Sequence, residues 1–183
     1  SKLRRLLLKS KMLLKIFNLY KGFSLKFVTY RGNVFNDELN SFLNKYDFDL
    51  GVSKLGFKVR DNIISSFKNG LLNDHNAILP LFRGRSVVEF SILHGLSYYS
   101  TVHFIDGSID TGGILKIFDY SKLTGKSMEE IKAHLKESSH ERLLSVITGL
   151  NNNTNVKRNK FAEGLTYYSI HPFIYKHIIN RIN

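Results

Sequence analysis

Residues 71–86 read LLNDHNAILPLFRGRS, an apolar run interrupted by an Asn, a His, a Leu-Pro and an Arg-Gly. The run begins as a predicted strand at 70–74, so Asn73 and His75 lie where that strand ends. A second polar stretch, HFIDGSIDTGGIL at 103–115, continues from another predicted strand. The arrangement of these two strand ends therefore decides both the fold and the candidate site.

Predicted strands and helices alternate on both sides of this stretch. The longest helix begins with a capping box, Ser127 followed by Glu130, and we expect it to bend near Ser138 and Ser139. This alternation predicts an α/β domain with a mostly parallel sheet flanked by helices, in which ligands bind outside the carboxyl ends of the strands. Both polar clusters are therefore expected at one rim of the sheet. Strands are expected at 24–30, 48–55, 70–74, 99–106 and 112–120, and helices at 2–20, 36–46, 60–67, 85–95, 127–150 and 171–180.

The composition predicts a single domain over 1–183. The chain has 183 residues, 43% of them hydrophobic, which is enough for a sizeable core. It has no cysteine, which excludes disulfides and thiolate metal sites. No apolar run is long enough to span a bilayer, and the Leu-rich start, interrupted by Lys and Arg, does not read as a signal peptide. We therefore expect a soluble, cytoplasmic protein.

Positive charge is concentrated at the start of the chain. The net charge is +12, and nine Lys or Arg residues precede the first acid, Asp37. Such a balance favours anionic partners. Residues 1–22 read as a basic amphipathic helix, which could cover a sheet face or lie on an anionic surface.

Asn73, His75 and Asp110, called the trio below, could act together on a carbonyl group. An Asn amide can hold a developing oxyanion, a His can move a proton, and an Asp can fix the imidazole tautomer. The sequence lacks G-x-S-x-G, Walker A and G-x-G-x-x-G motifs, which favours direct transfer or hydrolysis without a covalent intermediate. Taken singly, each of these residues also fits an ordinary turn. The other histidines do not cluster as metal ligands would, so no metal site is expected.

The two stretches resemble the 10-formyltetrahydrofolate-dependent formyltransferase family, including its sugar-nucleotide and methionyl-tRNA members. The resemblance covers residues 48–120 and implies a Rossmann-like fold. Members usually have a longer βαβ portion before their Asn-x-His, so part of that portion is expected to be missing or altered here. The matching residues are Asn73, His75, Leu79, Pro80, Arg83 and Gly84, followed by His103, Phe104, Asp106, Asp110, Thr111 and Gly112.

The resemblance implies that the trio is catalytic and that 10-formyltetrahydrofolate is the co-substrate. Asn73 and protonated His75 would stabilise the oxyanion while an amine attacks the formyl carbon, and Asp110 would hold His75 and draw off protons through water. The loop 105–110 would line the folate pocket, with Ile105, Asp106, Gly107 and Asp110 as its contacts.

The resemblance leaves several acceptors open. A nucleotide-linked amino sugar is the first expectation, with Arg83 and Arg85 as contacts to its phosphate or carboxylate. The alternatives are glycinamide ribonucleotide or another formyltransferase substrate, hydrolysis of formyl-folate itself, and a truncated non-catalytic member that binds anionic partners. For the enzyme, nucleic acid is not expected as a partner, and a homodimer is considered.

Overall fold

The computed structural model describes residues 37–54, 56–150 and 163–182, all within the compact unit Asn33–Asn183. The expected helix at 2–20 and the expected strand at 24–30 lie outside the described residues, as does the expected polar loop at 151–160. The single domain over 1–183 and the basic helix within 1–22 therefore stay predictions.

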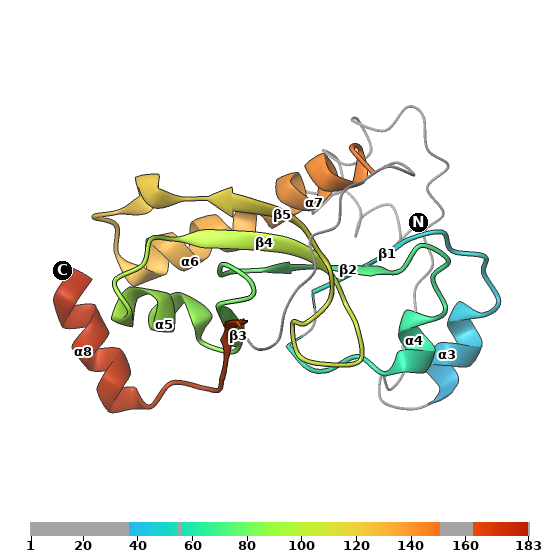
Figure 1. Ribbon diagram of the computed structural model, residues 1–183, viewed down its shortest axis with the longest axis horizontal. Coiled ribbons are helices and arrows are strands. Elements are labelled where there is room, and N and C mark those ends of the chain that lie inside the picture. The colour runs from blue at the N-terminus through green and yellow to red at the C-terminus, as the bar shows by residue number, and fades with distance from the viewer. Residues whose placement is uncertain (1–36, 55, 151–162, 183) are drawn as a thin grey trace, which may run out of the picture. The chain divides into compact units, whose positions relative to one another are not determined.

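The central sheet has four strands in the order β1-β2-β4-β5 (Figure 1). The α/β class is confirmed, but the mostly parallel sheet is wrong for these strands: β1 and β2 are parallel, whereas β2–β4 and β4–β5 are antiparallel. The loop between β4 and β5 holds no crossover helix, so the chain turns straight back on itself. The bounds are β1 Gly51–Ser53, β2 Leu71–His75, β4 Tyr99–Phe104 and β5 Ile114–Asp119.

The expected helices within the described residues are present, and the longest one is divided as predicted. Ser127 caps α6 in a full capping box with Glu130. The helix stops at Ser138, whose hydroxyl donates to the His134 carbonyl at 2.6 Å and accepts from Arg142 at 2.6 Å. A hydroxyl bonded back to the preceding turn bends a helix, which explains the break. The bounds are α3 Asp37–Leu43, α4 Asp61–Ile64, α5 Val87–Leu93, η1 Ser121–Leu123, α6 Met128–Glu137, α7 Ser139–Ile147 and α8 Pro172–Ile182.

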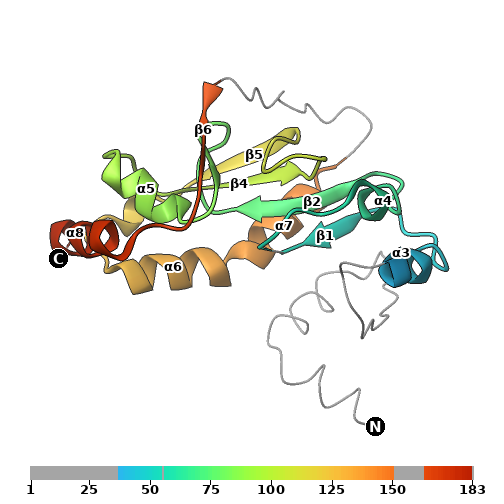
Figure 2. The ribbon, with the colours of Figure 1, turned by 90° about the horizontal axis from the view of Figure 1, so that it is seen from below.

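The two faces of the sheet have different coverings. Figure 2 shows α6 and α7 along one face, with β6 (Leu165–Tyr167), the partner of β3 (Phe82–Gly84), on the other. Helix α5 contacts α6 directly, because Val88 packs in one cluster with Ile131 and Glu89 accepts from Lys132 at 2.6 Å. Since side chains alternate along a strand, β2 contributes side chains to both faces of the sheet. Leu72 packs in one cluster with Leu143 of α7, and the next residue, Asn73, points the opposite way.

β3 and β6 form a second, two-stranded parallel sheet that the sequence did not predict. Each strand is only three residues long, which is too short for an alternating pattern to be recognised. Phe82 and Tyr167 stack with ring centroids 5.3 Å apart. Gly84 has φ of +92°, and a Cβ there would lie 2.1 Å from the Tyr167 carbonyl oxygen. This pair therefore requires glycine at 84, and it carries the Gly84 amide to the candidate site.

Candidate active site

The trio lies on one wall of a cavity. Its members do not meet at one carboxyl rim of the sheet, as the sequence predicted, because β2 and β4 are antiparallel and their carboxyl ends lie at opposite ends of the pair. Asp110 Oδ2 accepts a hydrogen bond from the Gly84 amide at 2.8 Å and lies 3.4 Å from His75 Nδ1. Asn73 joins the group through His103, the residue opposite it in the β2–β4 register. Its amide lies 3.2 Å from His103 Nε2, which in turn lies 3.6 Å from Asp110 Oδ1. The structure thus brings all three predicted residues together.

The hydrogen bonds of His75 define its tautomer. Its Nε2 lies 2.7 Å from the Phe82 carbonyl oxygen, which can only accept, so Nε2 carries a proton. Its Nδ1 faces Asp110 at 3.4 Å, which is longer than an ordinary N–H···O bond. Nδ1 is therefore the position at which this buried ring can take up or release a proton, beside a carboxylate and within reach of a bound group.

His103 is a site residue that the sequence analysis did not select. Its Nδ1 donates to the Phe104 carbonyl at 2.7 Å, so Nε2 of the neutral ring accepts from the Asn73 amide. Burial, together with repulsion from the neighbouring His75, lowers the pKa of His103 to about 4. The ring is therefore neutral at physiological pH and fixes which side of the Asn73 amide carries the hydrogens. The sequence feature that could have identified His103 as a site residue was its place in the HFIDGSID stretch.

We expect neutral His103 to make stability pH-dependent. The unfolded ring takes a proton near 6.5, whereas the folded ring, facing Asn73, His75 and Asp110, resists protonation down to about 4. The free energy of unfolding should therefore decrease as the pH falls from 6.5 towards 4, because the unfolded state binds more protons. In urea titrations across this range, His103→Gln should show a smaller decrease than the wild type. His177→Gln, on the exposed part of α8, should follow the wild type, and equal pH profiles for all three proteins would contradict this account.

The loop that presents Asp110 is organised by its own side chains. Asp110 has φ of +50°, a conformation that Asp tolerates better than most residues. Asp106 Oδ1 accepts from the Ser108 amide at 3.1 Å and from the Thr111 hydroxyl at 2.6 Å. The Asp106 carboxylate therefore stabilises the conformation of this loop. A Cβ on Gly112 would lie 1.9 Å from the Phe104 carbonyl oxygen, so the loop closes only with glycine there.

The cavity has a volume of about 510 Å³, within the usual range of roughly 300–1,000 Å³ for small-molecule pockets. Of the residues expected to contact folate, Ile105 and Asp110 line it, whereas Asp106 and Gly107 are not among its lining residues. Its wall consists of Ser53, Lys54, Gly56, Phe57, Lys58, Val59, Asn73, Asp74, His75, Asn76, Gly84, Arg85, Val87, His103, Ile105, Ser108, Ile109, Asp110, Tyr167 and Tyr168.

The two arginines expected to contact the acceptor have different positions. Arg83 is 1% exposed and lies outside the cavity wall. Its guanidinium donates to the carbonyl oxygens of Pro80 at 3.0 Å and Gly164 at 2.6 Å, so it ties the start of β3 to β6. The structure therefore gives Arg83 a structural place and does not support acceptor contact. Arg85 is exposed and lines the cavity.

Within the described ranges, no group of three or more His, Asp or Glu side chains is arranged to hold a metal ion. None of the helices described here is long and apolar enough to cross a membrane.

Comparison with known proteins gives one consistent family. A family model described as formyl transferase matches residues 17–147. The methionyl-tRNA formyltransferase of Rickettsia typhi is 30% identical over 134 residues, which is 72% of this chain and 44% of that protein. That of Finegoldia magna is 32% identical over 100 residues, 54% of this chain and 32% of that protein. The chain thus spans less than half the length of these relatives.

Solved structures confirm the Rossmann-like fold. Methionyl-tRNA formyltransferase from Clostridium thermocellum has a TM-score of 0.63 at 18% identity, with 89% of this chain and 68% of that chain covered. The formyltransferase PseJ from Anoxybacillus kamchatkensis was solved with UDP-4,6-dideoxy-4-formamido-L-AltNAc and tetrahydrofolate. Its TM-score is 0.62 at 18% identity, covering 87% of this chain and 82% of that chain. Because the family model covers well over half of the sequence, the chain belongs to the formyl transferase family.

Proposed function

We propose that the protein transfers a formyl group from 10-formyltetrahydrofolate to a primary amine. The observation that carries the proposal is the convergence of Asn73, His75 and Asp110 on one cavity, with Asp110 held by the Gly84 amide at 2.8 Å. Members of the family are folate-dependent enzymes that transfer formyl groups. The bound co-substrate supplies the formyl group, and the residues of this chain supply orientation, charge and proton transfer.

Each member of the trio has a distinct role in this proposal. Asn73 uses one amide hydrogen for His103, which leaves the other for the formyl oxygen as negative charge develops there. Protonated His75 adds positive charge beside that oxygen, with its Nδ1 not committed to a short bond. Asp110 accepts, through water, the proton that the attacking amine releases, and the departing nitrogen of tetrahydrofolate takes up a proton as its bond to the formyl carbon breaks.

The cavity residues fit a folate co-substrate. Ile105 and Ile109 give apolar surface, and the trio gives a few convergent polar groups, the usual composition of such pockets. Ser53 Oγ and Asn76 Oδ1 belong to residues of the cavity wall and have no hydrogen-bond partner among the described residues. Buried polar atoms are normally paired, so these atoms mark positions where a bound group could complete a bond.

A nucleotide-linked amino sugar is our first choice of acceptor. PseJ was solved with a UDP-linked formamido sugar, and Arg85 offers this cavity a cation for phosphate. Glycinamide ribonucleotide, aminoacyl-tRNA and water are the alternative acceptors. A non-catalytic protein that binds anionic partners is the alternative from another class, favoured by the net charge of +12. Cytoplasmic location and a homodimer stay predictions.

Incubating the purified chain with 10-formyltetrahydrofolate and a panel of amines tests the proposal. We expect an N-formylated product, detected by mass spectrometry, only when the folate and one class of amine are both present. Formate released without any amine would instead identify a hydrolase. If calorimetry shows no folate binding while DNA or anionic vesicles bind in a salt-sensitive manner, the non-catalytic alternative is correct.

A further inference from the structure

Three basic residues, Lys54, Lys58 and Arg85, line the cavity. The ammonium of Lys54 is directed to Asp74, on the face of the sheet that packs against α7, so the name rim cations is used here for Lys58 and Arg85. Lys58 lies in the loop after β1, and Arg85 follows β3. A Cβ on Gly56, in the same loop as Lys58, would lie 3.8 Å from a terminal nitrogen of Arg85, so the guanidinium lies against this loop.

The described residues do not neutralise the rim cations, since neither Lys58 nor Arg85 forms an ion pair within them. Lys54 differs, because its Nζ lies 3.8 Å from Asp74 Oδ2, and the charges that act on it are those of Asp74, Arg142 and Lys136. Two cations on one cavity wall without an ion-pair partner among the described residues favour the binding of an anion.

The rim cations lie next to the reacting groups along the chain. Ser53, the last residue of β1 before the loop that carries Lys58, is in register with Asn73 across β1 and β2. Gly84, which precedes Arg85, donates its amide to Asp110 at 2.8 Å. A ligand held by the rim cations therefore occupies the same cavity as the trio.

We propose that Lys58 and Arg85 form a subsite for a multiply charged oxyanion of one of the two substrates, an inference that rests on the proposed formyl transfer. A planar guanidinium matches two oxygens of a phosphate or carboxylate, and the ammonium group adds a point charge. Two positive charges suit a diphosphate or two carboxylates better than one carboxylate.

The oxyanion has two possible sources, the phosphates of the acceptor and the glutamate carboxylates of the folate. Tyr168 favours the acceptor, because its side chain is 73% exposed, lines the cavity and offers a ring face to a nucleobase. The shared chemistry is an oxyanion with two or more charges, and binding measurements can separate the sources.

Isothermal titration calorimetry on Lys58→Gln and Arg85→Gln tests the subsite. The probes are inorganic pyrophosphate, UDP, and 5-formyltetrahydrofolate with one and with three glutamates. Each variant should weaken binding of the recognised probe about tenfold, the usual effect of one lost charge-assisted hydrogen bond. Lys122→Gln, exposed on η1 outside the cavity wall, is the matched control and should bind as the wild type does. Melting temperatures should not fall, since each substitution removes a charge that forms no ion pair among the described residues.

The pattern of losses decides the source. Weaker pyrophosphate and UDP binding with unchanged folate binding assigns the subsite to the acceptor, whereas a loss that grows with the number of glutamates assigns it to the folate. Unchanged binding of all probes in both variants overturns the subsite, even if the wild type binds folate and transfers formyl groups. If the wild type binds no folate but loses pyrophosphate binding on substitution, the subsite stands and the formyl transfer fails.

Discussion

His75→Ala should lower kcat/KM for formyl transfer by about 10²–10⁴-fold, the range typical of a lost acid–base group. The imidazole is 6% exposed and has its Nε2 tied to the Phe82 carbonyl at 2.7 Å, so Nδ1 alone faces Asp110. Removing the ring removes both the positive charge near the formyl oxygen and the proton acceptor next to Asp110. Initial rates at saturating co-substrate, followed by product mass spectrometry, measure the effect.

A second variant separates chemistry from folding. His75→Gln retains an amide donor of similar reach for the Phe82 carbonyl, so its melting temperature should stay close to that of the wild type. Because the amide cannot be protonated, this variant should react nearly as slowly as the alanine variant. His177→Ala, exposed on α8, is the control and should react normally. A rate within tenfold of the wild type for either His75 variant would remove His75 from the proposed mechanism.

Asp110→Asn should give a loss of similar size, because it keeps an oxygen for the Gly84 amide but removes the negative charge. Combined with His75→Ala, it should add little, since groups that act as one unit are strongly non-additive in their kinetic effects. Losses that multiply in the double variant would indicate two independent roles.

Local signals predicted most of the described elements. The capping box at Ser127, the strand through Asn73 and the turn residues before Asp110 all depend on a few neighbouring residues, so a sequence can show them. The placement of Asn73 and His75 on one side of β2 followed from strand alternation. These signals placed Asn73 and His75 together, whereas Asp110 was joined to them by an expected parallel sheet, which is wrong for β2 and β4, and by the family resemblance.

Features that depend on distant partners were not predictable. The β3–β6 pair joins residues about 83 positions apart, as in the bond from Arg83 Nε to Thr166 Oγ1. In the sequence, an arginine before a glycine was interpreted as a ligand contact. The structure shows instead that the Arg83 guanidinium donates to the carbonyl oxygens of Pro80 and Gly164, which makes it a structural residue. His103 required the β2–β4 register, which the expectation of a mostly parallel sheet could not provide.

Arg142→Met should destabilise the fold by about 3–5 kcal/mol, the usual cost of leaving one member of a buried ion pair without its partner. The pair joins β2 to α7: Arg142 Nε and Nη2 donate to the two oxygens of Asp74 at 3.0 and 2.7 Å, and both side chains are at most 2% exposed. Arg142 also donates to the Tyr120 hydroxyl at 2.8 Å. Urea titrations at neutral pH measure the loss.

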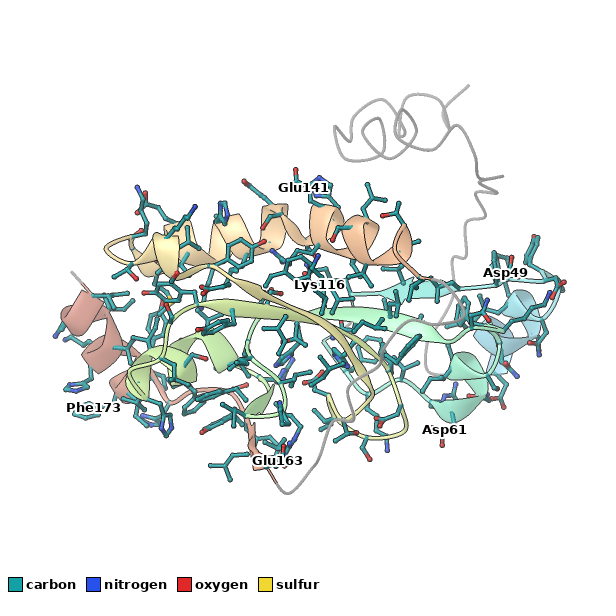
Figure 3. All side chains as sticks on the ribbon, turned by 45° about the horizontal axis from the view of Figure 1, so that its top comes forward. Asp49, Asp61, Lys116, Glu141, Glu163 and Phe173 are labelled. Atoms are coloured by element: carbon teal, nitrogen blue, oxygen red, sulfur yellow. The ribbon has the colours of Figure 1, made fainter. Side chains whose placement is uncertain are left out.

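The neighbouring Glu141 provides a matched control. Figure 3 shows Glu141 on the side of α7 away from the sheet, and its side chain is 61% exposed. Glu141→Gln should change the free energy of unfolding by no more than about 0.5 kcal/mol, as is usual for surface positions. An equally small change for Arg142→Met would show that the pair contributes little to the folded state.

Asp74→Leu combined with Arg142→Met should recover most of the stability, since replacing both charges of a buried pair by apolar groups is often neutral or stabilising. Asp74 is buried, which alone would raise its pKa, but hydrogen bonds from Arg142 and Ser100 hold its pKa below the ordinary value. Its contribution is therefore complete above the unfolded pKa of 3.8 and is lost as the pH falls through the folded pKa. The double variant should lack this acid-dependent component.

The same double variant tests whether the ion pair on one face of β2 is independent of the trio on the other face. Asp74 lies between Asn73 and His75 in sequence, yet its carboxylate is bonded to α7 on the opposite face of the sheet from the trio. A refolded double variant should therefore retain formyl transfer within about tenfold, because strand alternation separates the pair from the reacting groups. If the double variant is as stable as the wild type but as slow as His75→Ala, Asp74 acts in the reaction, and the ion pair is part of the active site.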